Sequence, residues 1–273
     1  CGSDQHWLPI DNYQEIPEGR LAERTSPTNI GLTLLATVSA YDFGYVSAVR
    51  VGERLQGHLG ALEGLRRYRG HFLNWYDTRS RQPLSPPYIS TVDSGNLAAH
   101  LIVLRGALQE LASGPVLPTR WREGVEDAAG VLLEEVDRAV GQAAFAASGN
   151  VAHALAALRQ EVAALAQIPD SQPDIVAALK RCDAQVAGVV PTAPGDPEVA
   201  FWSQLLRRQC VELTCDLVRL APWLEDINPG YRASAGNLLH YLALRQSDIR
   251  ELQQDLALLG LSRLGRSEAH ALS

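Results

Sequence analysis

Apolar residues recur at spacings of three and four over most of this chain, a period that predicts amphipathic helices. The first expected helix begins at Ser26 and Pro27, because serine is a favoured N-cap and proline fits the first helical position, and it continues to about Val49. This stretch is apolar on almost every side, which predicts burial. A second helix is expected over residues 51–68, and the two should form an antiparallel pair.

The helical pattern breaks between residues 69 and 92. Prolines and aromatic residues interrupt it, and we predict a long ordered loop, a kind of segment that often carries function. A third helix should follow over residues 97–111, capped by Asp93 or Ser94 and ended at Gly114.

Beyond residue 118 the chain is rich in Ala, Leu, Val, Glu and Arg with a helical period. Helices are expected near residues 119–147, 150–167, 172–188, 197–221 and 233–260. Asp196 with Pro197, and Ser171 with Asp174, have the residue types of helix starts. No window alternates for long enough to indicate a strand, so we predict an all-α chain of helical hairpins. Its expected parts are an N-terminal region, 1–114, and an Ala/Leu-rich helical region, 115–273.

Composition narrows the classes of function. The 273 residues include 24 Lys+Arg and 31 Asp+Glu, a formal net charge of -7, and the basic residues are scattered, which argues against nucleic-acid binding. No apolar run reaches the roughly 18–20 residues of a membrane helix, so this segment should be soluble, without a membrane span. The four cysteines lack zinc-ligand spacing, and we expect no metal and no cofactor. Because methionine is absent even at position 1, we expect a processed chain or a piece of a longer polypeptide.

Side chains suited to binding concentrate before residue 115, in three clusters. The first covers residues 24–29 at a helix start, where N–H groups and hydroxyls can bind ligand oxygens. The second, His71 with Asn74-Trp75-Tyr76-Asp77, places two aromatic faces beside an amide and a carboxylate, which is the chemistry of a sugar site. The third covers residues 90–96 at the next helix start.

Each cluster also has a purely structural interpretation. The first and third suit helix caps, and the second suits a loop held by its own aromatic rings. Asp77 and Asp93 are the acids inside the clusters and hence the candidate catalytic carboxylates. A glycosidase needs two carboxyls about 5–5.5 Å apart for retention, or about 6.5–9.5 Å apart for inversion, and the sequence does not define their separation.

The clusters, in this order, resemble the cyclic β-1,2-glucan synthases over about residues 7–111. The motifs that carry the resemblance are Trp7-Leu8-Pro9 with Asp11-Asn12-Tyr13-Gln14-Glu15, Arg24-Thr25-Ser26-Pro27-Thr28-Asn29-Ile30-Gly31, Asn74-Trp75-Tyr76-Asp77 and Ser90-Thr91-Val92-Asp93-Ser94-Gly95-Asn96-Leu97. The resemblance implies a large bacterial inner-membrane enzyme with a glycosyltransferase domain, a glucoamylase-like (α/α)6 domain for transglycosylation and ring closure, and a phosphorylase-like domain. The present residues would open that middle region, as part of an (α/α)6-toroid-like domain with an additional helical bundle.

The resemblance also implies roles for residues. The catalytic carboxylates would lie in a continuation of the helical barrel, so we expect the isolated chain to be inactive and Asp77 and Asp93 to be weak catalytic candidates. Trp75 and Tyr76 would stack on glucosyl units. The groups expected to bind sugar hydroxyls are Arg24, Asn29, Asp77, Asp93 and Asn96. The expected partners are β-1,2-glucan or its oligosaccharides and the remainder of the parent polypeptide.

Two other functions stay open at this point. In the first, the chain is a non-catalytic all-α scaffold or interaction module, and the clusters are helix caps and loop contacts. In the second, it is a complete small glycosidase that uses Asp77 and Asp93. Convergence of the three clusters on one face would favour a binding site, whereas their burial beneath helices would favour the scaffold.

Overall fold

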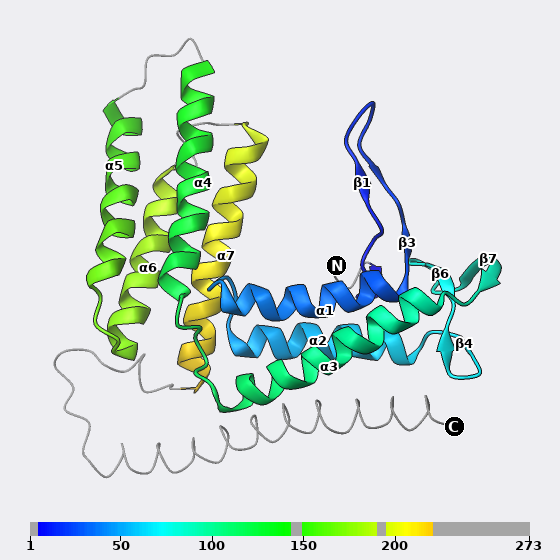
Figure 1. The fold of residues 1–273 in the computed structure, drawn as a ribbon. Coiled ribbons are helices and arrows are strands. Elements are labelled where there is room, and N and C mark those ends of the chain that lie inside the picture. The colour runs from blue at the N-terminus through cyan, green and yellow to red at the C-terminus, as the bar shows by residue number, and fades with distance from the viewer. Residues whose placement is uncertain (1–4, 143–148, 190–194, 221–273) are drawn as a thin grey trace. The chain divides into compact units, whose positions relative to one another are not determined.

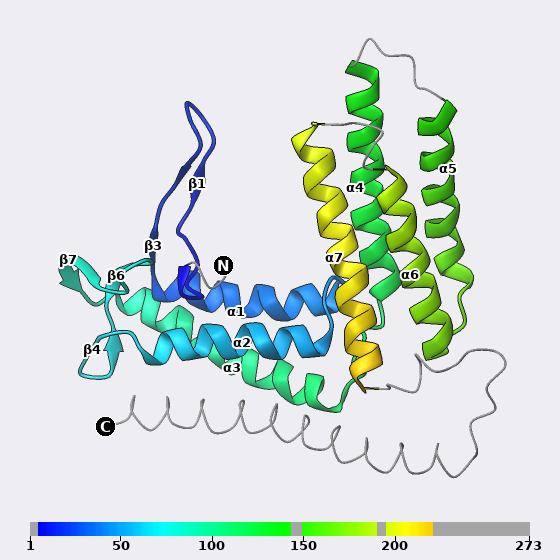
Figure 2. The same ribbon diagram turned by 180° about the vertical axis from the view of Figure 1, so that it is seen from behind.

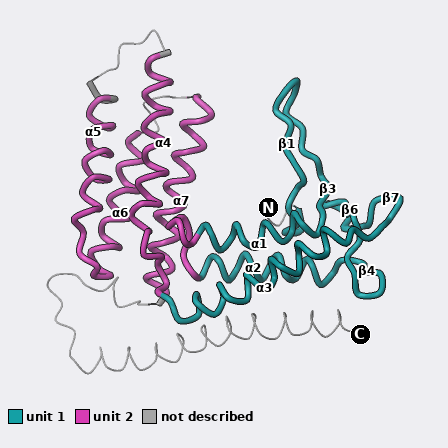
Figure 3. Tube along the Cα trace, in the orientation of Figure 1, with its two compact units in different colours: residues 1–40, 49–114, 250–273 teal, residues 41–48, 115–249 magenta. Residues whose placement is uncertain are grey.

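The computed structural model describes residues 5–142, 149–189 and 195–220, which divide into two compact units (Figures 1, 2 and 3). The first unit contains residues 5–40 and 49–114, and the second contains 41–48 and the described part of 115–220. Helices make up most of the described residues, which confirms the mainly helical prediction. The helix expected over residues 233–260 lies outside them.

Three helices form the body of the first unit: α1 (Pro27–Asp42), α2 (Ala48–Glu63) and α3 (Thr91–Ser113). Helix α2 runs antiparallel to α1 (Figures 1 and 2). Leucines dominate the buried positions of these helices, including Leu34, Leu55, Leu62, Leu104 and Leu108. Their recurrence at spacings of three and four is the signal by which the sequence predicted the helices.

The first unit also contains short strands, which the all-α prediction did not include. They are β1 (Tyr13–Gln14), β2 (Arg20–Leu21), β3 (Arg24–Thr25), β4 (Arg67–Tyr68), β5 (His71–Phe72), β6 (Asn74–Asp77) and β7 (Pro83–Tyr88). Strands β1 and β2, and β4 and β5, form two-stranded antiparallel sheets, and a third sheet has the order β3-β6-β7. The prolines of β7 are compatible with this sheet because β7 lies at its edge, where an absent N–H donor is tolerated. Half of the residues of the expected loop over 69–92 therefore lie in strands, and the last two belong to α3.

Helices α1 and α3 approach closely at Gly31. A Cβ atom at that position would lie 2.2 Å from Nδ1 of His100 and 3.1 Å from its Cβ, so only glycine leaves room for the imidazole. Gly106, also on α3, has no atom within 4 Å of its corresponding Cβ position. A methyl group therefore has room at Gly106 but not at Gly31.

The N-terminal segment is anchored on α2 by Trp7 and Leu8. The indole of Trp7 packs so closely on Gly57 that a Cβ atom there would lie 2.5 Å from Cδ2 of Trp7. The indole also contacts the His58 ring edge-on. His58 is only 4% exposed, and its Nδ1 donates a 2.6 Å hydrogen bond to the Trp7 carbonyl. Because burial disfavours the imidazolium, the pKa of His58 lies below 6.5 despite that bond.

The second unit is a bundle of four helices. They are α4 (Trp121–Gln142), α5 (Gly149–Ala164), α6 (Gln172–Val189) and α7 (Pro197–Leu220), and a short 3-10 helix, η2 (Leu165–Gln167), follows α5. The neighbouring pairs are α4 with α5, α5 with α6, α6 with α7 and α7 with α4, so the helices enclose one core. Each of the four helices contributes a fully buried leucine to this core: Leu132, Leu158, Leu179 and Leu206.

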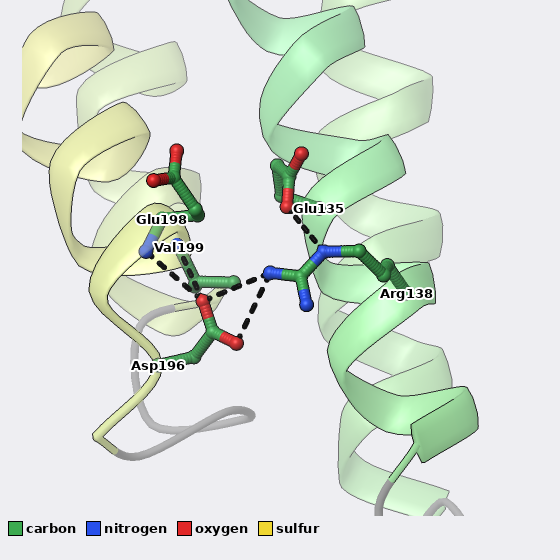
Figure 4. A network of polar contacts seen from close by, with 5 residues as sticks. All are labelled: Glu135, Arg138, Asp196, Glu198 and Val199. Atoms are coloured by element: carbon green, nitrogen blue, oxygen red, sulfur yellow. Dashed lines mark hydrogen bonds and ion pairs between the residues drawn. The ribbon is translucent and has the colours of Figure 1, made fainter. Parts of the chain in front are cut away.

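An arginine and a carboxylate join each neighbouring pair of helices in this bundle. The pairs are Arg159 with Asp137, Arg181 with Glu161, Arg207 with Asp183, and Arg138 with Asp196. Arg138 contacts both oxygens of Asp196, at 3.3 and 3.2 Å, and also binds Glu135 (Figure 4). Exposed pairs of this kind contribute about 0–1 kcal/mol each, so the apolar core contributes most of the stability of the bundle.

The predicted starts of α6 and α7 are confirmed. Oδ1 of Asp196 accepts hydrogen bonds from the main-chain N–H groups of Glu198 and Val199, at 3.0 Å each (Figure 4). Oγ of Ser171 accepts one from the N–H of Asp174 at 3.3 Å. These side chains satisfy donors that the first helical turn leaves unpaired.

The connection between α1 and α2 belongs to the second unit. The first helix was expected to reach Val49, but it ends at Asp42, and Gly44 has a φ of 86°. The main chains of Gly44 and Gly124 are in such close contact that a Cβ on Gly124 would lie 2.3 Å from the Gly44 carbonyl oxygen. Buried Ser47 donates a 2.5 Å hydrogen bond to buried Asp216 of α7. The division into domains at residue 114 stays a prediction.

We predict opposite effects of alanine at Gly31 and Gly106. Gly31→Ala forces the His100 ring to move and should lower the free energy of unfolding by about 1–3 kcal/mol. Gly106→Ala, at an open helical position, should raise it by about 0.5–1 kcal/mol, because alanine is the better helix former. Urea unfolding of both variants measures the difference, and equal effects would contradict the close approach of α1 and α3.

We predict an acid-sensitive contribution from His58. Since its pKa is lower in the folded chain than in the unfolded chain, its contribution to stability is complete above pH 6.5 and is lost as the pH falls through the folded value. His58→Asn keeps an N–H donor for the Trp7 carbonyl but cannot titrate. Urea unfolding on both sides of pH 6.5 should show a larger loss for the wild-type chain than for this variant. Parallel losses would exclude His58 as the source.

Candidate functional site

The three sequence clusters meet at one end of the first unit. Strand β3, which contains Arg24, leads directly into α1, and β7 leads into α3. Strand β6 lies between β3 and β7, so the sheet brings the second cluster against the starts of both helices (Figure 1). In the antiparallel register Arg24 lies opposite Asp77, and Thr25 lies opposite Tyr76.

The guanidinium of Arg24 lies over one face of the Trp75 ring. Arg24 is paired with Asp77, so Trp75, two positions before Asp77, is a diagonal neighbour of Arg24 on the same face of the sheet. The guanidinium carbon of Arg24 lies 4.7 Å from the centroid of the Trp75 indole. Asp11 holds the guanidinium through Nε and Nη2, at 3.1 and 3.0 Å. Its other carboxylate oxygen accepts a 3.0 Å hydrogen bond from the side-chain amide of Asn29. Arg24, Asn29 and Trp75, all predicted from the sequence, therefore belong to one contact network.

Asp93 joins the starts of α1 and α3. The N-cap of α3 is Ser90, whose hydroxyl accepts from the N–H of Asp93 at 3.1 Å. The sequence-based choice of Asp93 or Ser94 as the cap was wrong, because Ser90 takes that position and places Asp93 in the first turn. From there the carboxylate lies near the hydroxyls of Ser26 and Thr28 at the start of α1, which help to lower its pKa.

Each hydroxyl around Asp93 also accepts a hydrogen bond from elsewhere. Oγ of Ser26 accepts from the N–H of Asn29 at 3.2 Å, and Oγ1 of Thr28 accepts from the side-chain amide of Asn96 at 3.1 Å. The hydroxyl hydrogens are thus free to donate to the carboxylate. Burial of Asp93 would raise its pKa, but hydrogen bonds from the hydroxyls of Ser90, Thr28 and Ser26 outweigh burial and lower the pKa.

Tyr76 does not have the predicted stacking role. Exposure alternates along β6, where Asn74 and Tyr76 are buried and Trp75 and Asp77 are partly exposed. Tyr76 is 0% exposed, and its hydroxyl donates to the Arg66 carbonyl and accepts from the N–H of Leu73, both at 2.7 Å. It belongs to the core, so we remove it from the candidate stacking residues.

Asp77 organises the turn after β6. Its Oδ1 accepts hydrogen bonds from the main-chain N–H groups of Arg79 and Ser80 and from the Ser80 hydroxyl. The main-chain and hydroxyl hydrogen bonds from Ser80 are the main causes of the lowered pKa of Asp77. A glycosidase general acid needs a raised pKa, whereas the pKa values of Asp77 and Asp93 are both lowered. Neither fits the role of general acid, whereas hydroxyl binding by Asp77 stays a prediction.

Two buried polar atoms at this junction have no hydrogen-bond partner among the described residues. They are Oδ1 of Asn74, a side chain only 3% exposed, and Oγ1 of Thr25, which is fully buried. The amide nitrogen of Asn74 faces Asp93 at 3.5 Å, which leaves the carbonyl oxygen as the free acceptor. Such groups favour a hydrogen-bonding solvent or ligand molecule beside them.

The described residues contain no group of three His, Cys, Asp or Glu side chains placed to hold a metal ion. None of the described helices is long and apolar enough to cross a membrane. The cluster is instead an aromatic ring, a paired guanidinium, amides, hydroxyls and carboxylates, which together can stack on an uncharged ring and exchange hydrogen bonds with hydroxyls.

No protein-family model matches the chain. A curated protein does: over 136 residues the chain is 43% identical to the cyclic β-(1,2)-glucan synthase NdvB of Rhizobium meliloti. The chain is related to the cyclic β-(1,2)-glucan synthases. The match covers 50% of this chain but 5% of that protein, and it confirms the family resemblance inferred from the motifs.

Two residues that contact the predicted site residues were not assigned to the site from the sequence. Asp11 appeared only in a motif that carries the family resemblance, although its carboxylate binds two of the predicted site residues, Arg24 and Asn29. Asn74 was placed in a cluster without a role of its own, although it lies against Asp93. The acidic character of Asp11 was visible in the sequence, but nothing local showed that the segment folds back onto Arg24.

We predict that the charge of Asp93 stabilises the junction. Asp93→Asn keeps the shape but weakens the hydrogen bonds from α1, and it should lower the free energy of unfolding at neutral pH by about 1–3 kcal/mol. Because the pKa of Asp93 is depressed in the fold, the difference between wild type and variant should be complete above the unfolded value near 4 and shrink as the pH falls through the folded value.

Glu110→Gln is the matched control for Asp93→Asn. It removes one negative charge from an exposed position of the same helix. Urea unfolding at neutral and acid pH measures both variants. A loss in Glu110→Gln as large as that in Asp93→Asn would show that net charge, rather than the junction, is responsible.

Proposed function

We propose that this chain contributes part of the glucan-binding surface of a cyclic β-(1,2)-glucan synthase. The observation that carries the proposal is the convergence of Trp75, Arg24 and Asn29 with the Asp93 junction, in a chain related to NdvB. In this proposal Trp75 stacks on a glucosyl ring. Arg24, Asn29, Asp93 and Asn96 bind sugar hydroxyls.

The chemistry of these groups suits an uncharged, hydroxyl-rich ligand. Trp75 is partly exposed, and Arg24 retains N–H donors beyond the two that contact Asp11. Asn96 is exposed next to Thr28 and can offer its amide oxygen. An aromatic face bordered by neutral or charge-balanced donors is the usual composition of a sugar-binding site.

We further propose that α1, α2 and α3 form part of the wall of an (α/α)6-toroid-like domain whose remaining helices belong to the parent polypeptide. The parent would act in transglycosylation and ring closure of β-1,2-glucan at the bacterial inner membrane. The lowered pKa values of Asp77 and Asp93 support the placement of the general acid elsewhere in the parent. The isolated chain would therefore bind glucan without cleaving it.

Calorimetric titration of the 273-residue chain tests binding. Linear β-1,2-glucooligosaccharides should bind in preference to β-1,3 and β-1,4 oligomers. Trp75→Ala should weaken binding by about tenfold or more, because it removes the stacking surface and the support of Arg24.

Phe201→Ala is the matched control for Trp75→Ala, since it removes an exposed aromatic ring from α7 in the second unit. Its affinity should equal that of the wild-type chain. If the folded wild-type chain binds none of the glucans, the proposal fails and the non-catalytic scaffold becomes the better interpretation.

A further inference from the structure

Asp11 connects the N-terminal segment to the candidate site. Its position is set by main-chain pairing, since its own N–H donates to the Ala22 carbonyl at 3.1 Å and the Ala22 N–H donates to the Asn12 carbonyl at 2.9 Å. This pairing brings the carboxylate to Arg24, two residues beyond Ala22. A side chain held by its main chain can in turn position the groups that it binds.

The two oxygens of Asp11 have separate partners. Oδ2 accepts from Nε and Nη2 of Arg24, which leaves the guanidinium against the Trp75 ring. Oδ1 accepts from the Asn29 side-chain amide at 3.0 Å, which leaves the Asn29 oxygen pointing away from the carboxylate. The Asp11 carboxylate therefore controls the orientation of two of the proposed hydroxyl-binding residues, Arg24 and Asn29. Through Arg24 it also acts on Trp75, the proposed stacking residue.

Asp11 also sets the charge of the surface. Its carboxylate balances the guanidinium of Arg24, so this pair has no net charge. Asp93 is linked to the same network through Ser26 and Asn29, and its lowered pKa keeps it ionised. The network as a whole is thus negative, which disfavours an anionic ligand.

We propose that Asp11 is a positioning and specificity residue of this site, which holds Arg24 and Asn29 for a neutral glycan and excludes a glycan that carries carboxylates. The inference rests on the proposed glucan binding. It predicts two separable effects of removing the charge: looser binding of the neutral ligand, and weaker discrimination against an anionic one.

The test uses the 273-residue chain and two probes, a linear β-1,2-glucooligosaccharide and the same oligosaccharide oxidised at C6 to carboxylates. The wild-type chain should bind the neutral probe at least about tenfold more tightly than the oxidised one. Asp11→Asn should bind the neutral probe about three- to tenfold more weakly and reduce the preference to about twofold or less, because the network of Arg24 and Asp93 then has no net charge.

Salt dependence and a control variant separate this role from a structural one. In the wild-type chain, binding of the oxidised probe should strengthen as sodium chloride screens its repulsion from the negative network. In Asp11→Asn, whose network has no net charge, that binding should change little with salt, and binding of the neutral probe should not depend on salt in either chain. Glu15→Gln removes one negative charge from an exposed position of the same N-terminal segment and should behave as wild type. A general loss of folding in Asp11→Asn would weaken both probes equally and leave the preference unchanged, which would overturn the inference.

The outcomes distinguish the two proposals. If the wild-type chain and Asp11→Asn bind the neutral probe with the same affinity and the same preference, Asp11 has no such role, although glucan binding stands. If the wild-type chain binds neither probe, the proposed function fails and this inference fails with it. Loss of binding in Trp75→Ala together with the altered preference in Asp11→Asn would support both.

Discussion

The arrangement at this end of the first unit depends on one carboxylate placed between two helix starts. Asp93 lies in the first turn of α3, near the hydroxyls of Ser26 and Thr28 at the start of α1, which help to lower its pKa. A negative charge is favoured near the unpaired N–H groups at a helix start, and here it lies beside two such starts. Because β3 leads into α1 and β7 leads into α3, this contact also determines where the sheet lies. Trp75, on the central strand of that sheet, is positioned as a consequence.

Local signals were sufficient for most of the helices but not for the sheet. Ser26 with Pro27 and Asp196 with Pro197 mark helix starts correctly, because a cap is made by residues within one turn of each other. Asp93 and Ser94 were the predicted caps on that evidence, whereas Ser90 takes the position. The residues at the start of α1 that lie near Asp93 are more than 60 positions away in the sequence. Strands β6 and β7 lack a clear alternation of apolar residues, and β7 includes prolines. The pairing of β6 with β3 and of β7 with β6 could therefore not be read from their own sequence.

The same distinction explains which site residues were predicted. Trp75 and Tyr76 are adjacent aromatic residues with similar chemistry, and only the alternation of burial along β6 shows that Tyr76 faces the core. Asp77 was an obvious acid, but its neighbours Arg79 and Ser80 engage it in a turn. Asp11 acquires its role from the return of the chain at Ala22, a main-chain contact that no side-chain motif encodes. Residue type therefore predicted the chemistry present, and pairing between distant segments decided which groups were available.

A comparison of two arginine–tryptophan contacts shows why binding is assigned to the first unit. The guanidinium carbons of Arg24 and Arg122 both lie 4.7 Å from a tryptophan centroid. Trp121 is a buried core residue, and Arg122 donates to the carbonyls of Leu165 and Ile168 and to Asp170, so its donors join α4 to the end of α5 and the segment after it. Arg24 is 48% exposed against 21% for Arg122, and its ring partner is only partly buried. The Arg122–Trp121 pair thus helps to hold the bundle of the second unit together. The Arg24–Trp75 pair in the first unit is more exposed, which is why the proposed glucan-binding surface includes it.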